Sequence, residues 1–324
     1  MTAFQINAPS PSFPLAVVNA TGDGQLNQVD RDLLFALYRE HGALLLRGFA
    51  VDLDAFGTFA QNYCPVPIHN ESGKRLVLDG ASGVQSVNLG VRSFPLHPEL
   101  SREPWRPDSA FFCCVKPPSS GGQTTVCDGV EIVRQLPREL RREMATRRIR
   151  YAVPATAADL HFWLGKSQPD EILLQNPPAE CPFTFERHEG RLMRCFTRPL
   201  LHRTRFQHDL AWGNFILFAR YLRGVKTYPL LDDWTVVPDD WVETVKAISD
   251  RLTVEIGWRE QDLLMVDNSR FMHGRTEVVP GDGRMIATYF GYLANAEPDP
   301  EEPASPAWRK PGFVPPQFAA RTAA

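Results

Sequence analysis

Two short stretches of the sequence place a histidine and a glutamate one residue apart, HPE at residues 97–99 and HNE at residues 69–71. In an extended segment, residues i and i+2 point to the same side, so either pair could bind one metal ion. With 8 histidines and 38 acidic residues in 324 positions, chance supplies roughly one such pair. Two ligands also hold an ion poorly. A third ligand must therefore come from elsewhere in the chain.

The best third candidate is His273, in the sequence DNSRFMHGR at 267–275, which follows an apolar, strand-like run. Arg284 begins the next apolar run, after the turn-forming sequence PGDG at 280–283. We expect a hairpin that brings His273 and Arg284 onto neighbouring strands. A buried guanidinium needs an anionic partner, and its planar fork suits a carboxylate. This part of the chain therefore predicts a metal ligand beside a carboxylate-binding residue.

The composition limits the kind of protein that these residues serve. A hydrophobic content of 43% and a charged content of 23% are typical of a globular protein with a core. The formal net charge of −3 gives no indication of binding to nucleic acid or to a membrane surface. No secretory signal or membrane-spanning run is visible, and the 6 cysteines show no CxxC spacing. We therefore expect a cytoplasmic protein that binds neither nucleic acid nor membranes; no oligomeric state is predicted.

Short strand-like runs, with a few helical patterns, must position the candidate residues. Strands are expected at 43–49, 109–115, 252–258, 262–268 and 284–293; helices are expected at 27–41, at 128–147 in two pieces with Pro137 as the first residue of the second, and at 239–252. Residues 152–235 show little periodicity, and an extended polar tail is expected from 296. The pattern predicts a mainly β protein with flanking helices, closer to a β-sandwich than to a βαβ alternation.

The order of four sequence blocks resembles the TauD/TfdA family of iron(II)- and 2-oxoglutarate-dependent oxygenases. The blocks are LHPEL, FFCCVKPPSSGGQTTVCDG, WREQDLLMVDNSRFMHGR and GDGRMIATYFGYL. HGALLLRGF at 41–49 is similar to the N-terminal core strand of that family, and a glutamate in the first block resembles its clavaminate-synthase-like branch. The resemblance implies a double-stranded β-helix, or jelly roll, built as a single domain over 1–324. Residues 152–235 would then be a variable, lid-like segment, and 296–324 an extended tail.

The resemblance also implies a role for particular residues. His97, Glu99 and His273 match the iron ligands, and two histidines with one carboxylate form the facial triad of non-haem iron(II) oxygenases. Arg284 and Thr124 match the residues that hold the distal carboxylate of 2-oxoglutarate, the co-substrate used with O2.

Three further features of the sequence lie outside the implied ligand set. The second pair, at 69–71, lacks the surrounding blocks and is assigned to a surface loop. Gln261 stands where the family usually has a turn glycine. Arg275 is expected in a structural ion pair.

The substrate is the part of the function that the sequence predicts least. Gln85, Asn88, Arg102 and Trp105 are expected as substrate contacts, because they lie beside the ligand motif in the chain. The branch resemblance implies a small, amino-acid-like substrate, free or carrier-bound, and the presence of Glu99 favours hydroxylation over halogenation. Desaturation, cyclisation or epoxidation would use the same residues. A metal-dependent hydrolase and a non-catalytic jelly-roll binding protein are the more distant alternatives.

Overall fold

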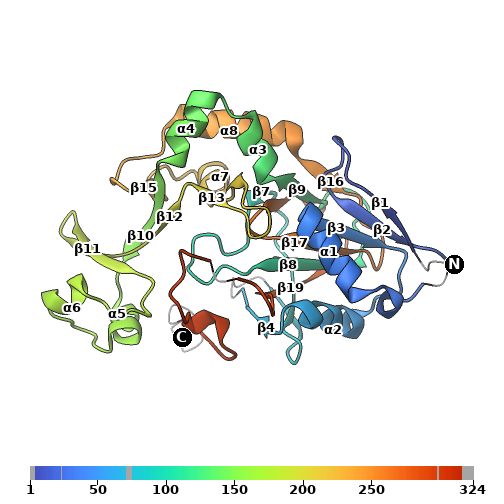
Figure 1. Cartoon of the computed structure of the whole chain (residues 1–324), viewed down its shortest axis with the longest axis horizontal. Helices are drawn as coiled ribbons and strands as arrows, with labels where there is room; N and C mark the ends of the chain where they lie inside the picture. The colour runs from blue at the N-terminus through green and yellow to red at the C-terminus, as the bar shows by residue number, and fades with distance from the viewer. Residues whose placement is uncertain (1–3, 23, 71–74, 298, 316–324) are drawn as a thin grey trace.

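Two β-sheets face each other in the centre of the computed structural model, and helices cover their outer faces (Figure 1). The structure describes residues 4–22, 24–70, 75–297 and 299–315. No helix among these residues is long and apolar enough to cross a membrane.

The larger sheet has nine strands. Its order is β1 (Phe4–Asn7), β2 (Ala16–Ala20), β3 (Ala43–Arg47), β17 (Leu263–Asp267), β8 (Ser109–Lys116), β19 (Met285–Tyr292), β6 (Val84–Ser86) and β5 (Val77–Asp79), with β4 (Val66–Pro67) also paired to β19. All neighbours are antiparallel except β2 and β3. The strands predicted around 43–49, 109–115, 262–268 and 284–293 are thus confirmed, and they form the middle of this sheet.

The smaller sheet carries both candidate histidines. Its order is β16 (Val254–Ile256), β9 (Thr124–Asp128), β18 (Phe271–Arg275) and β7 (Phe94–His97). Side chains alternate along a strand, so every second residue points into the space between the sheets. Phe112 and Phe290 of the large sheet meet Val126 and Phe271 of the small one in a single core. The predicted class, a mainly β jelly roll with flanking helices, is confirmed.

Helices close the outer face of each sheet. On the large sheet lie α1 (Arg31–His41) and α2 (Leu53–Tyr63); on the small sheet lie α3 (Gly129–Gln135), α7 (Ile216–Tyr221) and α8 (Asp239–Leu252), with α4 (Arg138–Ala145) nearby. The predicted helix at 27–41 begins at Arg31, because the Asp30 side chain accepts hydrogen bonds from the backbone of Asp32 and Leu33 and so caps it there. Pro137 caps α4 and is not its first residue.

The segment at 152–235 contains real but short elements. They are the end of β10 (Arg148–Pro154), α5 (Ala157–Leu164), α6 (Glu171–Gln175), β11 (Thr184–His188), β12 (Arg191–Pro199), β13 (Leu201–Arg203), β14 (Leu210–Trp212), α7 and β15 (Leu230–Leu231). Strands β11, β12, β10 and β15 form a separate sheet that projects from the core (Figure 1). Elements of two to nine residues are too short to show a periodic pattern, which explains why the sequence was uninformative here.

Residues 299–315 are docked on the core, contrary to the expected extended tail, and residues 316–324 of that prediction lie outside the described residues. Trp308, in a short 3-10 turn (Ala307–Arg309), is only 1% exposed. Arg309 donates to both carboxylate oxygens of the buried Asp108, at 2.9 and 3.0 Å. An apolar tryptophan and a bidentate ion pair fix residues 299–315 to the core.

The hairpin predicted between His273 and Arg284 is wrong. Strand β18 already has β9 and β7 on its two edges, so β19 crosses to the other sheet and pairs with β8. His273 and Arg284 therefore belong to opposite layers of the jelly roll.

Gln261 has a left-handed backbone, with φ of +67°, in the turn before β17. Left-handed geometry costs a residue with a Cβ about 1–2 kcal/mol, whereas glycine adopts it freely but loses roughly 0.5–1 kcal/mol more on folding. We expect Gln261→Gly to raise the free energy of unfolding by about 0.5–1 kcal/mol in chemical denaturation. Gln135→Gly in helix α3 should lower it instead. A loss of stability in the first variant would contradict this account.

Candidate functional site

The two histidines face each other between the sheets. His97 ends β7 and is the ladder partner of His273 on β18, and their ring centroids are 4.8 Å apart. His97 Nδ1 lies 2.9 Å from the carbonyl oxygen of Pro95. A proton on Nδ1 would be donated to that oxygen, which leaves the Nε2 lone pair for a ligand. Phe218 packs on His97 and Phe112 on His273, at 4.8 and 5.1 Å, so apolar rings surround both.

Glu99 is held beside the histidines by its backbone. The Asn268 side chain accepts from the Glu99 N–H at 2.8 Å and donates to the Glu99 carbonyl at 3.0 Å and to that of Pro107 at 2.9 Å. Asn268 is fully buried, directly after β17. The amide thereby fixes the loop that follows β7 and points the Glu99 carboxylate inward, with Oε2 3.7 Å from His273 Nε2.

Two residues that the sequence did not single out contact the Glu99 carboxylate. Asn70 Nδ2 donates to Oε1, and Arg75 Nη2 lies 3.4 Å from Oε2. Within the pair assigned to a surface loop, His69 is exposed as expected, but Asn70 reaches the site, so that assignment is wrong for Asn70. Glu71 lies outside the described residues. Asn70 and Arg75 are thus part of the candidate site.

Burial and charge set the protonation of the cluster. Burial lowers the pKa of His97 to about 4, and the neighbouring His273 adds to this effect. Burial alone would raise the pKa of Glu99, but the Arg75 guanidinium and His273 hold it well below its usual range. A neutral imidazole and an ionised carboxylate are the forms that bind a metal ion.

The donor set of His97, Glu99 and His273 fits a divalent transition metal, but the three side chains do not surround a common point in this structure. Among the described residues, no three histidine, cysteine, aspartate or glutamate side chains are placed to hold an ion as they stand. The carboxylate of Glu99 is engaged by Asn70 and Arg75 instead. His273 Nδ1 is buried without a hydrogen-bond partner. His273 Nε2, 3.7 Å from Glu99 Oε2, is the nitrogen that would bind a metal ion together with that carboxylate.

Arg284 precedes β19 and points between the sheets. Gly122 has a φ of +65°, and a Cβ at that position would stand 2.9 Å from Arg284 Cδ, so only glycine leaves room for the side chain. Arg284 Nε is buried without a partner, and no ion pair involves this residue in the described part of the chain. Burial, with repulsion from Arg275, lowers the pKa of Arg284 to about 10. This guanidinium therefore lacks the anion that would compensate its burial.

Thr124 and Arg275 line the same region on the small sheet. Thr124 is buried, and its Oγ1 accepts a hydrogen bond from Trp258 Nε1 at 3.0 Å, which leaves the hydroxyl proton for another acceptor. The expected ion pair of Arg275 is not formed with any of the described residues. Its guanidinium donates to the carbonyl oxygens of Asn88, Gly90 and Arg92 and lies over the Phe94 ring. Arg275 thus ties the segment before β7 to β18.

The four predicted substrate contacts separate into two groups. Gln85 on β6 is near the cluster, since its Oε1 accepts from the Asn70 N–H at 3.0 Å. Arg102 lies over the Phe215 ring, which stacks on Phe218 beside His97. Asn88 and Trp105 have structural contacts instead. The Asn88 side chain accepts from Gly90, and Trp105 is 1% exposed among Trp163, Phe183 and Phe313.

A jelly roll with two histidines and a carboxylate on its inner face is the arrangement of the non-haem iron(II) oxygenases. The chain belongs to the TauD, TfdA family, because the model of the "Taurine catabolism dioxygenase TauD, TfdA family" matches residues 9–289. The class predicted from the sequence, a dioxygenase that uses iron(II), 2-oxoglutarate and O2, is confirmed. No curated protein sequence matches the chain.

Solved structures share the fold at low sequence identity. PvcB of Pseudomonas aeruginosa, described as an Fe, alpha-ketoglutarate dependent oxygenase from an isonitrile synthetic pathway, has a TM-score of 0.57 at 14% identity, over 90% of this chain and 92% of that chain. A taurine dioxygenase from Burkholderia xenovorans has 0.57 at 12%, over 89% of each chain. AAD-2 in complex with Mn(II) and N-oxalylglycine has 0.55 at 13%, over 90% and 98%.

Arg75 contacts the carboxylate of Glu99, a candidate metal ligand, so loss of Arg75 should weaken metal binding. We expect Arg75→Gln to raise the dissociation constant for Mn(II) about 10–100-fold, because partners of ligating carboxylates typically contribute that much. Titration of the metal-free protein followed by electron paramagnetic resonance would measure it. Arg75→Lys should recover part of the affinity, and the exposed Arg134→Gln should bind as the wild type does. Equal affinity in Arg75→Gln would show that the contact does not serve the metal.

Proposed function

We propose that this dioxygenase hydroxylates an unactivated C–H bond of a small, amino-acid-like substrate. His97, Glu99 and His273 would hold iron(II), and Arg284 with Thr124 would hold the distal carboxylate of 2-oxoglutarate. The observation that carries the proposal is the half-buried Arg284, whose Nε is buried without a partner among the described residues, together with the two facing histidines and Glu99. A dicarboxylate that reaches the metal with one end would neutralise that guanidinium with the other.

The residues of the chain prepare the site in three ways. When bound, iron(II) with 2-oxoglutarate supplies the O2-activating chemistry. Phe218 and Phe112 shield the histidines from water. Asn268 fixes the direction of Glu99, and Gly122 leaves the space through which Arg284 reaches the co-substrate. Rigid positioning of this kind lowers the barrier by keeping the reacting groups aligned.

The ligand carboxylate favours hydroxylation among the possible outcomes. Glu99 is present, buried and held by Asn268, so the third protein ligand is not missing as it is in halogenating oxygenases of this kind. Desaturation, cyclisation and epoxidation would need the same residues and differ only in where the substrate lies. A hydrolase with the same ligands would have no use for a buried guanidinium at the Arg284 position. The unpartnered Nε of Arg284 therefore favours the oxygenase.

Residues at the rim of the site indicate which groups would contact the substrate. Gln85 on one side and Arg102, over Phe215, on the other would offer a polar group and a cation to an amino-acid-like molecule. Helix α7, which belongs to the segment at 152–235, places Phe218 directly on His97. We infer that this segment acts as the lid over the single oxygenase domain, because it supplies one wall of the site.

Removal of the Arg284 side chain should weaken the binding of 2-oxoglutarate and leave the affinity for the metal ion unchanged. In Arg284→Ala, the weak visible band of the anaerobic iron(II)–2-oxoglutarate complex should need at least about 100-fold more co-substrate, since a charge-assisted bidentate contact is lost. Mn(II) affinity without 2-oxoglutarate should stay the same. If the wild type binds metal but shows no band, the oxygenase proposal fails. A band without succinate formation in air would favour a non-catalytic protein.

The two histidine–glutamate pairs should differ completely in their effect on turnover. We expect His97→Ala and His273→Ala to abolish the conversion of 2-oxoglutarate to succinate, because each removes a metal ligand. His69→Ala should stay within about two-fold of the wild type, since this side chain is exposed. Succinate assays on folded variants would measure this, and loss of turnover only in His69→Ala would mean that the wrong pair was assigned.

A further inference from the structure

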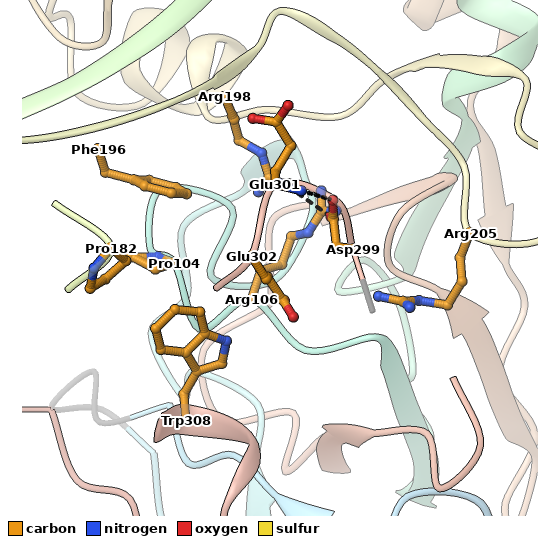
Figure 2. Close-up of a pocket in the computed structure, with 10 residues that line it drawn as sticks. All are labelled: Pro104, Arg106, Pro182, Phe196, Arg198, Arg205, Asp299, Glu301, Glu302 and Trp308. Atoms are coloured by element: carbon orange, nitrogen blue, oxygen red, sulfur yellow. Dashed lines mark hydrogen bonds and ion pairs between the residues drawn. The ribbon is translucent and has the colours of Figure 1, made fainter. Parts of the chain in front are cut away.

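A small cavity lies where three parts of the chain meet: the loop after Glu99, strand β12 and the C-terminal segment (Figure 2). Arg106, Arg198, Arg205 and Asp299 contribute charges to its wall, and Phe196 and Trp308 contribute rings. Its volume of about 20 Å³ has room for about one water-sized group. In Figure 2 the side chains of Arg106, Arg198 and Asp299 converge. The ligand triad does not line this cavity.

Arg106 is buried without an acceptor for its charge. It is 7% exposed, and among the described residues it has no ion-pair partner within 4 Å. Its Nη1 lies 3.5 Å from His202 Nε2, but that nitrogen is also 2.7 Å from the Ser269 carbonyl oxygen. A carbonyl only accepts, so His202 Nε2 carries the proton and cannot accept from Arg106. Among the described residues, the Arg106 guanidinium therefore has no carboxylate within 4 Å, and the charges of Asp299 and Asp267 act on it only from farther away.

Arg198 has only a distant carboxylate. It is 6% exposed, its Nε has no partner, and Asp299 Oδ2 lies 3.9 Å from Nη2. Arg205 is committed elsewhere, to Asp108 and the carbonyl of Glu297. Two buried guanidinium groups thus share one carboxylate at long range.

The nearby acids of the same segment are also committed. Glu301 pairs with Arg148, and Glu302 pairs with Arg309. The excess of positive charge affects neighbouring groups: burial, and then Arg198, lowers the pKa of Arg106 to about 9. Burial, with Arg106 and Arg198, holds the pKa of His202 well below its usual range. Among the described residues, neither Arg106 nor Arg198 therefore has a carboxylate within hydrogen-bond distance.

We propose that Arg106 and Arg198 form a carboxylate-binding site, which Asp299 fills incompletely from within the chain and which a small carboxylate-bearing molecule takes in exchange. The planar fork of a guanidinium suits two carboxylate oxygens. The cavity as it stands is too small for more than one such group, so the ligand enters as the C-terminal segment withdraws Asp299. A bound carboxylate would join the loop that carries Glu99 to strand β12. This site is separate from the 2-oxoglutarate site at Arg284 and does not depend on the proposed reaction.

Chemical rescue tests the site in the full-length protein. Asp299→Ala removes the internal carboxylate and leaves space, and we expect its Tm to fall by at least about 5 °C. Acetate at constant ionic strength should restore about 3 °C or more, in a saturable manner, whereas acetamide should not. Asp299→Asn should be destabilised without rescue, because the amide fills the same space. Equal effects of acetate and acetamide on Asp299→Ala would overturn the proposal.

Two further variants identify where acetate acts. The double variant Asp299→Ala with Arg106→Gln should show no acetate rescue, and neither should Glu301→Ala, because Glu301 lines the cavity but its carboxylate pairs with Arg148. If Arg106→Gln prevents folding, Arg198→Gln serves instead. Rescue that persists without either arginine would contradict the assignment.

In the wild type, the replacement of Asp299 by acetate can be followed through proteolysis of the C-terminal segment. Acetate should speed trypsin cleavage after Arg309 at least two-fold relative to acetamide, because it releases the docked segment. An unchanged rate of cleavage would show that no exchange takes place.

Discussion

A charge buried between the layers of this protein must be compensated where it stands, because taking an ion out of water costs several kcal/mol. Glu99 meets this requirement through Arg75 and Asn70. Arg284 does not meet it, and this unpartnered guanidinium is the structural feature that a dicarboxylate co-substrate would complete. The same requirement applies to Arg106 and Arg198 at the edge of the core. The two proposed carboxylate-binding sites are thus places where charge compensation by the described part of the chain is incomplete.

The geometry of the candidate metal site rests on one buried amide and one strand register. Asn268 holds both backbone polar groups of Glu99, and the ladder pairs His97 with His273. Because side chains alternate along a strand, a shift of one residue would turn a histidine to the outer face. The apolar rings of Phe112 and Phe218 then fix the imidazoles in place. The core packing and the arrangement of the ligands are therefore established together.

Two segments outside the central jelly roll border the candidate sites. Residues 152–235 form a small projecting sheet, yet α7 from this segment covers His97. The C-terminal segment looks polar in sequence, yet Trp308 and Arg309 anchor it beside Asp108. The first segment supplies a wall of the candidate metal site, and the second supplies a wall of the cavity at Arg106 and Arg198. This division is typical of folds in which a rigid scaffold carries loops that determine specificity.

The sequence by itself determined the mainly β class, the central strands and the family, since these depend on local periodicity and on blocks of adjacent residues. It also identified His97, Glu99, His273 and Arg284 as candidates. Only the tertiary structure decided that β18 and β19 lie in opposite sheets, and that Asn70, Arg75 and Asn268 reach Glu99. These contacts join residues 24 to 169 positions apart. Hydrogen bonds over such separations depend on how the layers pack, which local sequence patterns do not record.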